Sequence, residues 1–335
     1  LEVPQVFALA ATLDFENQVL DLDEGQVEIT GLSQGRVVLA AQRYVYDEEN
    51  DVLVDLIAEQ ECRPGDDLET TGNFVCEDGT VLSPGWVAVT GFNHYIDVLT
   101  NESIRGPFVG VFIWNVVFAL GSVVISFSLG LVLALALQNE RVRGRTVYRS
   151  IYILPYAIPG LLSMLIWVGL LNEQFGAVND LLGVFGIEQI PWLTDGNWAK
   201  VSLLLVNMWL TFPYMFLIST GALQAIPAEL QEAARVDGAN GWKVFWRITF
   251  PLLMVSLAPL LIASFAFAFN NFVLVFVLTN GGPPILDAAI SVGSTDILIT
   301  LTYDIALAGG VGTRFALAAA MSIFIFFIVL IISSI

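Results

Sequence analysis

The sequence predicts an all-α polytopic membrane protein with an acidic, β-rich extracytoplasmic domain at its N-terminal end. Of the 335 residues 56% are hydrophobic, and the mean hydropathy of +0.75 lies above that of ordinary soluble domains. The apolar residues gather into runs near or above the roughly twenty that a spanning helix needs. Before residue 107 the chain holds 21 acidic residues against 4 arginines. A water-facing part is therefore followed by a membrane-spanning part.

Residues 1–106 form the predicted acidic domain. Short alternating runs such as 27–30 and 44–46 are separated by Gly, Asp and Asn clusters, a pattern typical of small β-rich domains. Cys62 and Cys76 lie in one Pro/Gly/Asp-rich loop. An external domain permits a disulfide between them, and closing so short a loop would stabilise the fold by about 3 kcal/mol. Residues 92–104 predict an amphipathic helix at the membrane surface, which ends the domain.

The chain shows no catalytic or metal-binding pattern. Its one histidine, His94, is distant from the two cysteines, whereas a zinc site needs three or four ligands. No glycine-rich phosphate loop ending in Gly-Lys-Ser/Thr occurs, and no nucleophile is paired with a base. We therefore expect a chain that is no enzyme by itself, with no catalytic residue, metal or cofactor of its own and no nucleic-acid partner.

Five apolar spans are predicted within the membrane domain, 107–335. The loop at 139–149 contains Arg141, Arg143, Arg145 and Arg149, and the loop at 225–249 contains Arg235, Lys243 and Arg247, so both are cytoplasmic by the positive-inside rule. The loops at 172–199 and 279–313 are then external, like the acidic domain. Because residue 1 is Leu and no signal peptide follows, we expect a fragment whose missing N-terminal part contains further spans. The five spans are 108–137, 150–171, 200–223, 250–278 and 314–335.

Prolines and polar residues inside the spans indicate a cavity. Pro155, Pro159 and Pro213 free backbone carbonyls, which a membrane tolerates where these face protein or a water-filled space; a packing kink without a ligand is the alternative. Ser264, Phe267 and Asn271 are spaced to lie on one stripe of a helix. An amide in hydrocarbon is costly, so Asn270 or Asn271 should point at a partner. An aromatic ring between polar groups suits a sugar.

The loop at 225–249 is too polar to lie in a bilayer. Pro227, the acids after it and Gly238 following Asp237 predict a short helix with a start and a stop. Leu230, Ala233, Ala234 and Asp237 would give this helix a face of small residues that another protein could approach closely. A solvated connector is the alternative interpretation.

This loop resembles a known motif. Glu232-Ala233-Ala234, then Asp237-Gly238 and a hydrophobic and basic run to Pro251, looks like the EAA loop of ABC-importer permeases. The resemblance implies the type I ABC-importer permease fold. It also implies that the loop is a cytoplasmic coupling helix that docks into a cleft of an ATP-binding subunit.

Residues 92–335 resemble one group of these permeases more closely. The runs ILPYAIP (153–159), WLTFPYM (209–215), SFAFAFNNFVL (264–274) and LTNGGP (278–283) are similar to the larger permease subunit of maltose/maltodextrin importers, the MalF type. Spans four to eight of that family would correspond to this chain. Thr211 stands where that family has glycine, and Ala268 where it has a second asparagine. The resemblance places sugar contacts at Tyr156, Leu210, Tyr214, Ser264, Phe267 and Asn271.

The resemblance also implies the partners and the substrate. The partners are a second, MalG-like permease subunit, two ATP-binding cassette subunits that bind ATP and Mg, an extracytoplasmic sugar-binding protein and membrane lipid. The substrate is a neutral sugar such as maltose, maltodextrin or a trehalose-like oligosaccharide, carried across the cell membrane.

Two alternative functions are an ABC permease for another solute and a membrane-anchored extracellular receptor. An anion site should show Arg or a helix N-terminus at mid-membrane, and the predicted spans contain no central Arg or Lys. A secondary transporter is disfavoured because no acidic residue lies in the predicted spans to carry a coupling proton. Kinked spans with aligned polar residues argue against a simple anchor.

Overall fold

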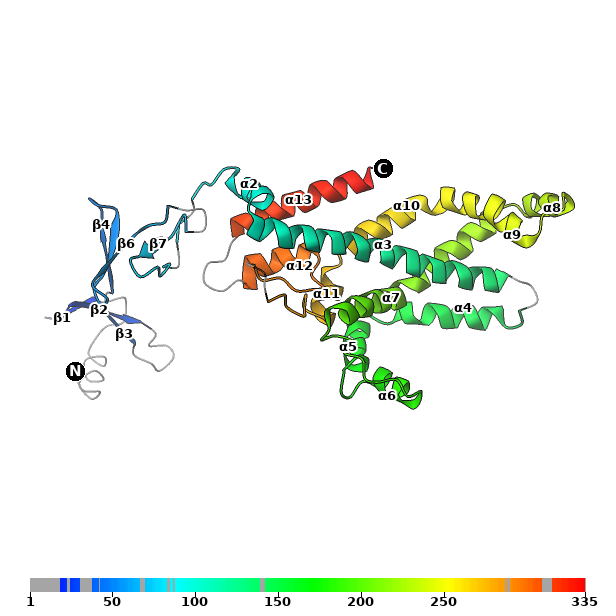
Figure 1. Cartoon of the computed structure of the whole chain (residues 1–335), viewed down its shortest axis with the longest axis horizontal. Helices are drawn as coiled ribbons and strands as arrows, with labels where there is room; N and C mark the ends of the chain where they lie inside the picture. The colour runs from blue at the N-terminus through cyan, green and yellow to red at the C-terminus, as the bar shows by residue number, and fades with distance from the viewer. Residues whose placement is uncertain are drawn as a thin grey trace. The chain divides into compact units, whose positions relative to one another are not determined.

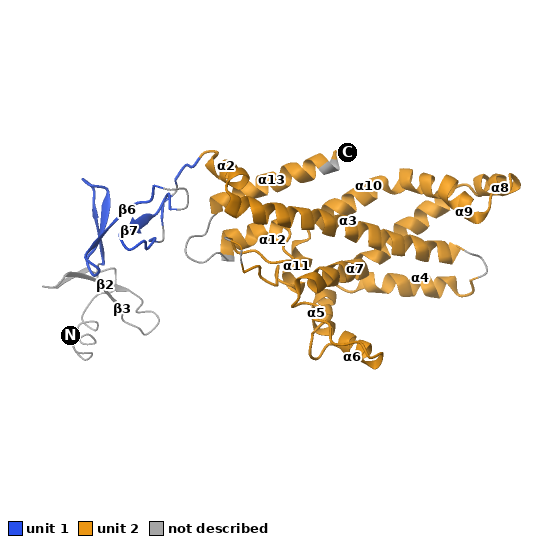
Figure 2. Ribbon diagram, in the orientation of Figure 1, with its two compact units in different colours: residues 1–90 blue, residues 91–335 orange. Residues whose placement is uncertain are grey.

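The computed structural model (Figure 1) describes residues 19–22, 25–30, 38–41, 43–66, 70–82, 85–86, 88–138, 142–286, 288, 290–308 and 315–334. The predicted cytoplasmic residue Arg141 lies outside the described residues. The chain divides into two compact units, 1–90 and 91–335, shown in Figure 2.

The first unit contains the strands predicted for the acidic domain, all paired antiparallel. One sheet has the order β1 (Val19–Leu22), β2 (Gly25–Thr30) and β3 (Val38–Ala41). The other is a meander of β4 (Tyr44–Asp47), β5 (Val52–Asp55), β6 (Gln60–Pro64) and β7 (Phe74–Cys76). Cys62 and Cys76 lie opposite each other on β6 and β7, are buried, and are joined by a disulfide.

The second unit is helical and contains the predicted spans. Its elements in chain order are α2 (Asn93–Thr100), α3 (Glu102–Gln138), α4 (Arg145–Ile153), η2 (Leu154–Ala157), α5 (Gly160–Leu170), α6 (Ala177–Val184), α7 (Gly196–Ala225), α8 (Ala228–Val236), α9 (Gly241–Val244), η3 (Phe245–Thr249), α10 (Phe250–Phe269), α11 (Phe272–Leu278), α12 (Leu298–Tyr303), η4 (Asp304–Ala308) and α13 (Phe315–Ser333).

The helix predicted at 92–104 belongs with the helical unit rather than with the acidic domain. It is divided at Asn101 into α2 and the start of α3. Val98 of α2 is fully buried, and Tyr95 packs edge-on against Phe324 of α13 with ring centroids 5.9 Å apart. The boundary between the two units therefore falls at 90/91, where the sequence had placed it at 106/107.

The predicted spans take different forms in the structure. Among the described residues three helices are long and apolar enough to cross a membrane: Glu102–Gln138, Gly196–Ala225 and Gly241–Phe269. The run at 150–171 is not one straight helix, because Arg145–Ala157 and Gly160–Leu170 meet at 91°. Pro159 is the cause, since a residue before proline is forced out of the helical region, and Ile158 has ψ 131°. The last predicted span corresponds to α13, whose apolar part, Phe315–Ile331, is shorter than these three helices.

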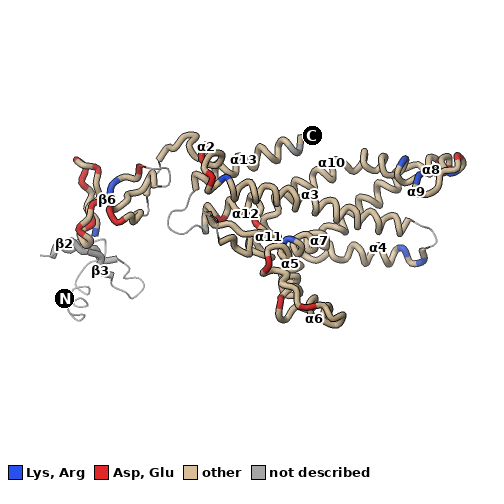
Figure 3. Tube along the Cα trace, viewed as in Figure 1, with Lys and Arg blue, Asp and Glu red and all other residues tan. Residues whose placement is uncertain are grey.

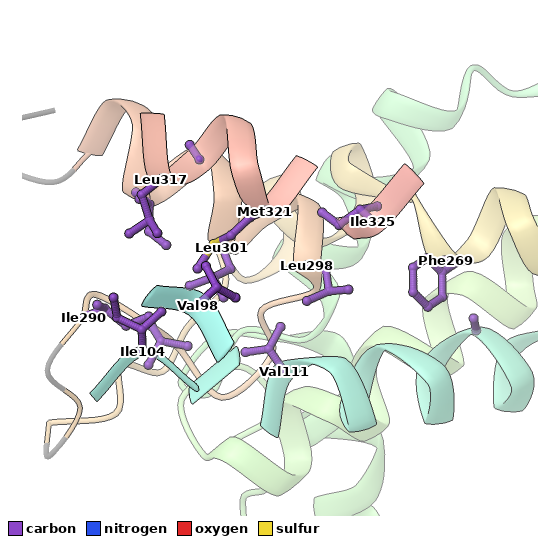
Figure 4. Close-up of a cluster of buried hydrophobic side chains, with 14 of the residues drawn as sticks. Val98, Ile104, Val111, Phe269, Ile290, Leu298, Leu301, Leu317, Met321 and Ile325 are labelled. Carbon is purple, nitrogen blue, oxygen red and sulfur yellow. The ribbon is translucent and has the colours of Figure 1, made fainter. Parts of the chain in front are cut away.

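The segment at 279–313, predicted to be an external loop, contains helices that pack into the unit. Leu298 and Leu301 of α12 are buried against Val98, Ile104 and residues of α13 (Figure 4). An apolar run follows Asp296, and it leaves water by packing against α3 and α13. This part of the chain therefore adds to the hydrophobic core at one end of the bundle.

Candidate functional site

A cavity of about 480 Å³ lies between α3, η2–α5, α7 and α10–α11. All six residues expected to contact a ligand line it, although they come from three separate runs of sequence. The structure thus brings together Tyr156, Leu210, Tyr214, Ser264, Phe267 and Asn271.

The break between η2 and α5 forms one wall of this cavity. Pro155, Tyr156, Ile158 and Gly160 all line it. Tyr156 has 59% of its surface exposed among the described residues. Of the three prolines that predicted cavity walls only Pro155 is a lining residue, and Pro213 is buried within an uninterrupted α7.

Helix α7 forms a second wall with one of its faces. Asn207, Leu210, Thr211 and Tyr214 follow each other at helical spacing and all line the cavity. The hydroxyl of Thr211 donates to the Asn207 carbonyl oxygen at 2.7 Å and lies 2.7 Å from the Ser126 hydroxyl of α3. Its hydrogen-bonding capacity is therefore used within the protein.

The third wall is built where α10 ends and α11 begins. Ser264 and Phe267 lie on α10, which stops at Phe269, so the predicted helical stripe does not continue to Asn271. Asn271 instead caps α11, its Oδ1 accepting from the Leu274 backbone N–H at 3.3 Å. It reaches the same cavity because the chain turns at Asn270.

Asn271 is the asparagine that has a buried partner. Its Nδ2 donates to Oδ1 of Asn207 on α7 at 3.3 Å, whereas Nδ2 of Asn270 donates to the Ala266 carbonyl of its own helix at 3.1 Å. Ser264 likewise donates to the Leu260 carbonyl at 2.7 Å. The Asn271–Asn207 pair thus joins two walls of the cavity.

Asn207 is the residue that sequence reasoning missed. It is 3% exposed, its Oδ1 is taken by Asn271, and its Nδ2 has no acceptor among the described residues. An amide in an apolar span, one turn before Leu210, was the available signal. Its free N–H groups can donate to a ligand in the cavity.

No charged side chain belongs to the cavity lining formed by the described residues. The polar groups are hydroxyls and amides, and the apolar ones include Phe267, which is 70% exposed. Such a lining can hydrogen-bond a neutral polar molecule and stack on its apolar faces. It offers no counterion to an anion.

The predicted short helix in the polar loop is confirmed as α8. It begins after Pro227 and ends at Val236, with Asp237 as its C-cap, and Gly238 follows with φ 84°, a backbone conformation that favours glycine. Glu232, Ala233, Asp237 and Gly238 are exposed and Ala234 is half-buried. Figures 1 and 3 show α8 at the end of the bundle where α4 begins, and arginines and lysine gather there.

Residues 126–335 match the family model for the binding-protein-dependent transport system inner membrane component. The chain is 47% identical over 249 residues to the maltose/maltodextrin transport system permease protein MalF of Escherichia coli (strain K12), covering 74% of this chain and 48% of that protein. It is 44% identical over 294 residues to MalF of Photorhabdus laumondii, covering 86% and 56%. The chain thus spans about half the length of these curated relatives.

Solved structures show the same fold. A chain from the crystal structure of a bacterial ABC transporter involved in the import of the acidic polysaccharide alginate has a TM-score of 0.60, with 24% identity over 75% of this chain and 82% of that chain. A second alginate transporter structure, in complex with an alginate pentasaccharide-bound periplasmic protein, also has a TM-score of 0.60. With the family model matched over 126–335, the chain belongs to the binding-protein-dependent transport system inner membrane components.

Proposed function

We propose that this chain is a membrane-spanning subunit of an ATP-driven importer that carries a neutral oligosaccharide of the maltose and maltodextrin class into the cytoplasm. The observation that carries the proposal is the uncharged cavity lined by Tyr156, Tyr214, Phe267 and the Asn207–Asn271 pair. The similarity to MalF permeases supports the choice of sugar.

The lining suits a sugar because a pyranose ring has apolar faces and a rim of hydroxyl groups. Phe267 and Tyr156 are well exposed at the cavity and would stack on the ring faces. Nδ2 of Asn207 and the hydroxyl of Tyr214 would bond the ring hydroxyls. Leu210 and Ser264 would complete the contact, with Ala268 leaving space where a longer side chain would reach the sugar.

A neutral sugar fits better than an acidic one. The solved relatives named above import alginate, whose carboxylates need cationic partners. A carboxylate in this cavity would lose water and gain no positive side chain among the described lining residues, at a cost of several kcal/mol. The same argument disfavours an oxyanion as the solute.

The exposed α8 supports an assembly with other subunits. Glu232, Ala233, Ala234, Asp237 and Gly238 would dock on an ATP-binding cassette subunit, of which an importer needs two. A second permease subunit would cover the open side of the cavity at Tyr156 and Phe267. A sugar-binding protein outside the cell would deliver the substrate, and the acidic unit would also lie outside.

Uptake of radiolabelled maltodextrin by the assembled complex in proteoliposomes tests the proposal. Phe267→Ala should lower uptake about ten-fold through lost stacking. Phe326→Ala is the matched control, because Phe326 is a similarly exposed phenylalanine on α13 outside the cavity lining. Wild-type uptake by an intact Phe267→Ala complex, or preferential uptake of a labelled acidic oligosaccharide, would overturn the proposal.

A further inference from the structure

Aromatic rings form a ladder along the helix that follows α8. Trp242 packs on Trp246 with ring centroids 5.7 Å apart, and Trp246 packs on Phe250 at 5.0 Å. Phe245 joins them from the inner side, 5.1 Å from Trp246, and contacts the hydrophobic core together with Phe250. Trp242 and Trp246 remain 71% and 47% exposed. Phe245 and Phe250 therefore fix the ladder to the hydrophobic core, while Trp242 and Trp246 are exposed at the surface.

A π-helical turn lies within the ladder. In η3 the Phe250 backbone N–H donates to the Phe245 carbonyl, five residues back, so the turn holds one residue more than an α-helical turn. Trp246 and Phe250, four residues apart, lie side by side across this turn.

Each tryptophan of the ladder is followed by a cation in the sequence. Lys243 and Arg247 are exposed, lie one turn apart, and make no ion pair with any described residue. Blue segments for Lys and Arg also lie by the start of α4, at the same end of the bundle (Figure 3), in a chain whose net charge is −19. Cations are thus concentrated at this end of the bundle, although the chain as a whole is strongly negative.

The position of the ladder points to the membrane surface. The helix Gly241–Phe269 is long and apolar enough to span a bilayer, and Trp242, Lys243, Trp246 and Arg247 occupy its first two turns. Tryptophan rings collect at the headgroup level of membranes, and cations beside them attract anionic lipid. Aromatic rings and unpaired cations together at the end of a span match this environment.

We propose that Trp242, Lys243, Trp246 and Arg247 form a binding surface for the headgroups of anionic phospholipids in the cytoplasmic leaflet. Bound lipid holds the start of this helix at a fixed depth, and α8, which ends only four residues before it, is held just beyond the headgroups. The assignment to the cytoplasmic leaflet rests on the proposed function, in which α8 faces the cytoplasm and docks on an ATP-binding subunit. The preference of this surface for anionic headgroups does not depend on which sugar the importer carries.

A photoreactive residue tests this surface in the assembled complex. p-Benzoylphenylalanine replaces Trp242, and the complex is illuminated in vesicles of equal phosphatidylglycerol and phosphatidylcholine. We expect lipid adducts at position 242, with phosphatidylglycerol enriched. Lys243→Gln and Arg247→Gln should each lower that enrichment about five-fold, which corresponds to about 1 kcal/mol for each cation. Mass spectrometry of the adducts gives the ratio of the two lipids.

Two controls separate this proposal from the proposed function. Arg105→Gln removes a cation near the start of α3, outside the proposed surface. It should leave the ratio of phosphatidylglycerol to phosphatidylcholine in the adducts unchanged. The same photoreactive residue at Val236, 87% exposed on α8, should label an ATP-binding subunit. If no protein adduct forms at position 236 while lipid adducts form at 242, the docking of α8 is contradicted and the lipid surface is not. Protein adducts at 242, or equal labelling of both lipids whatever the charge, would overturn the lipid surface.

Discussion

Asn271 makes two hydrogen bonds with different roles, one that caps α11 and one to Asn207, and a substitution can remove one and keep the other. Its Oδ1 caps α11, while its Nδ2 holds Asn207 with the free amide hydrogens of that residue available to the cavity. A buried amide is costly unless hydrogen-bonded, so each asparagine stabilises the other. Serine can replace the cap but cannot span the distance to Asn207.

Asn271→Ser and Asn271→Ala should both lower maltodextrin uptake about ten-fold or more, because both lose the amide that positions Asn207. Only the alanine variant should also loosen the start of α11, by about 1 kcal/mol, seen as faster hydrogen exchange of the Leu274 amide. Wild-type uptake by Asn271→Ser would reduce Asn271 to a helix cap.

Asp55 gives the first unit a predictable response to acid. Arg43 donates to both of its carboxylate oxygens, the shortest distance being 2.9 Å, and the backbone N–H groups of Ile57 and Ala58 also donate to it. These hydrogen bonds, that of Arg43 first, lower the pKa of Asp55 to about 2. In the unfolded chain an aspartate has a pKa of about 3.9.

Because the folded pKa is the lower one, the carboxylate stabilises the fold above about pH 4 and loses this contribution as the pH falls toward about 2. The protection factors for hydrogen exchange of β5 and β6 should therefore fall over this interval, and Asp55→Asn should remove this pH dependence. Glu61→Gln is the control, since the Glu61–Arg63 pair is exposed and contributes little. An unchanged pH profile in Asp55→Asn would contradict this assignment.

Helices α3 and α7 approach closely at one glycine. A Cβ atom on Gly130 would lie 2.6 Å from the backbone N of Phe216 and 2.7 Å from the backbone C of Met215. Backbone atoms cannot move aside as a flexible side chain would. The absence of a side chain at this position therefore lets the two longest helices pack together.

Gly130→Ala should lower the stability of the chain in detergent by about 1 to 3 kcal/mol, because the helices must separate. Gly110→Ala lies on the same helix with nothing within 4 Å of its added Cβ, and should be neutral or slightly stabilising. Thermal unfolding of both variants measures the difference. Equal midpoints would show that the two helices adjust freely.

At the scale of the whole molecule, the chain order links the cavity to α8. Helix α7 carries Asn207 and Tyr214 and ends at Ala225, and only two residues separate it from α8. After α8 the chain returns through α9 and η3 into α10, which carries Ser264 and Phe267. A displacement of α8 would therefore be transmitted along both helices that line the cavity.

Glu232→Lys should abolish most sugar-stimulated ATP hydrolysis in proteoliposomes, because it reverses a charge on the exposed face of α8 that would meet the ATP-binding subunit. Sugar binding by the external protein should not change. Glu188→Lys, an equal charge reversal on an exposed loop between α6 and α7, is the control. Full stimulation in the Glu232→Lys complex would refute the coupling role of this helix.

Local sequence determined the class of this protein and the place of the short polar helix α8. A bilayer admits only helices long enough to cross it and expels polar loops, so run lengths and charges were enough to predict the apolar runs and α8. The spacing of Leu210 and Tyr214 on a straight helix was equally predictable. These features depend on residues close together in the chain.

The tertiary structure decided where helices break and which residues meet. Asn115 of α3 donates to the Phe269 carbonyl at 3.0 Å and accepts from the Leu298 N–H at 2.9 Å, so one buried amide ends α10 and starts α12. Asn207 meets Asn271 across 64 positions of sequence. A helix that ends at membrane depth leaves backbone groups that other groups must satisfy, and where the partner is a distant side chain such as Asn115, no local pattern reveals it.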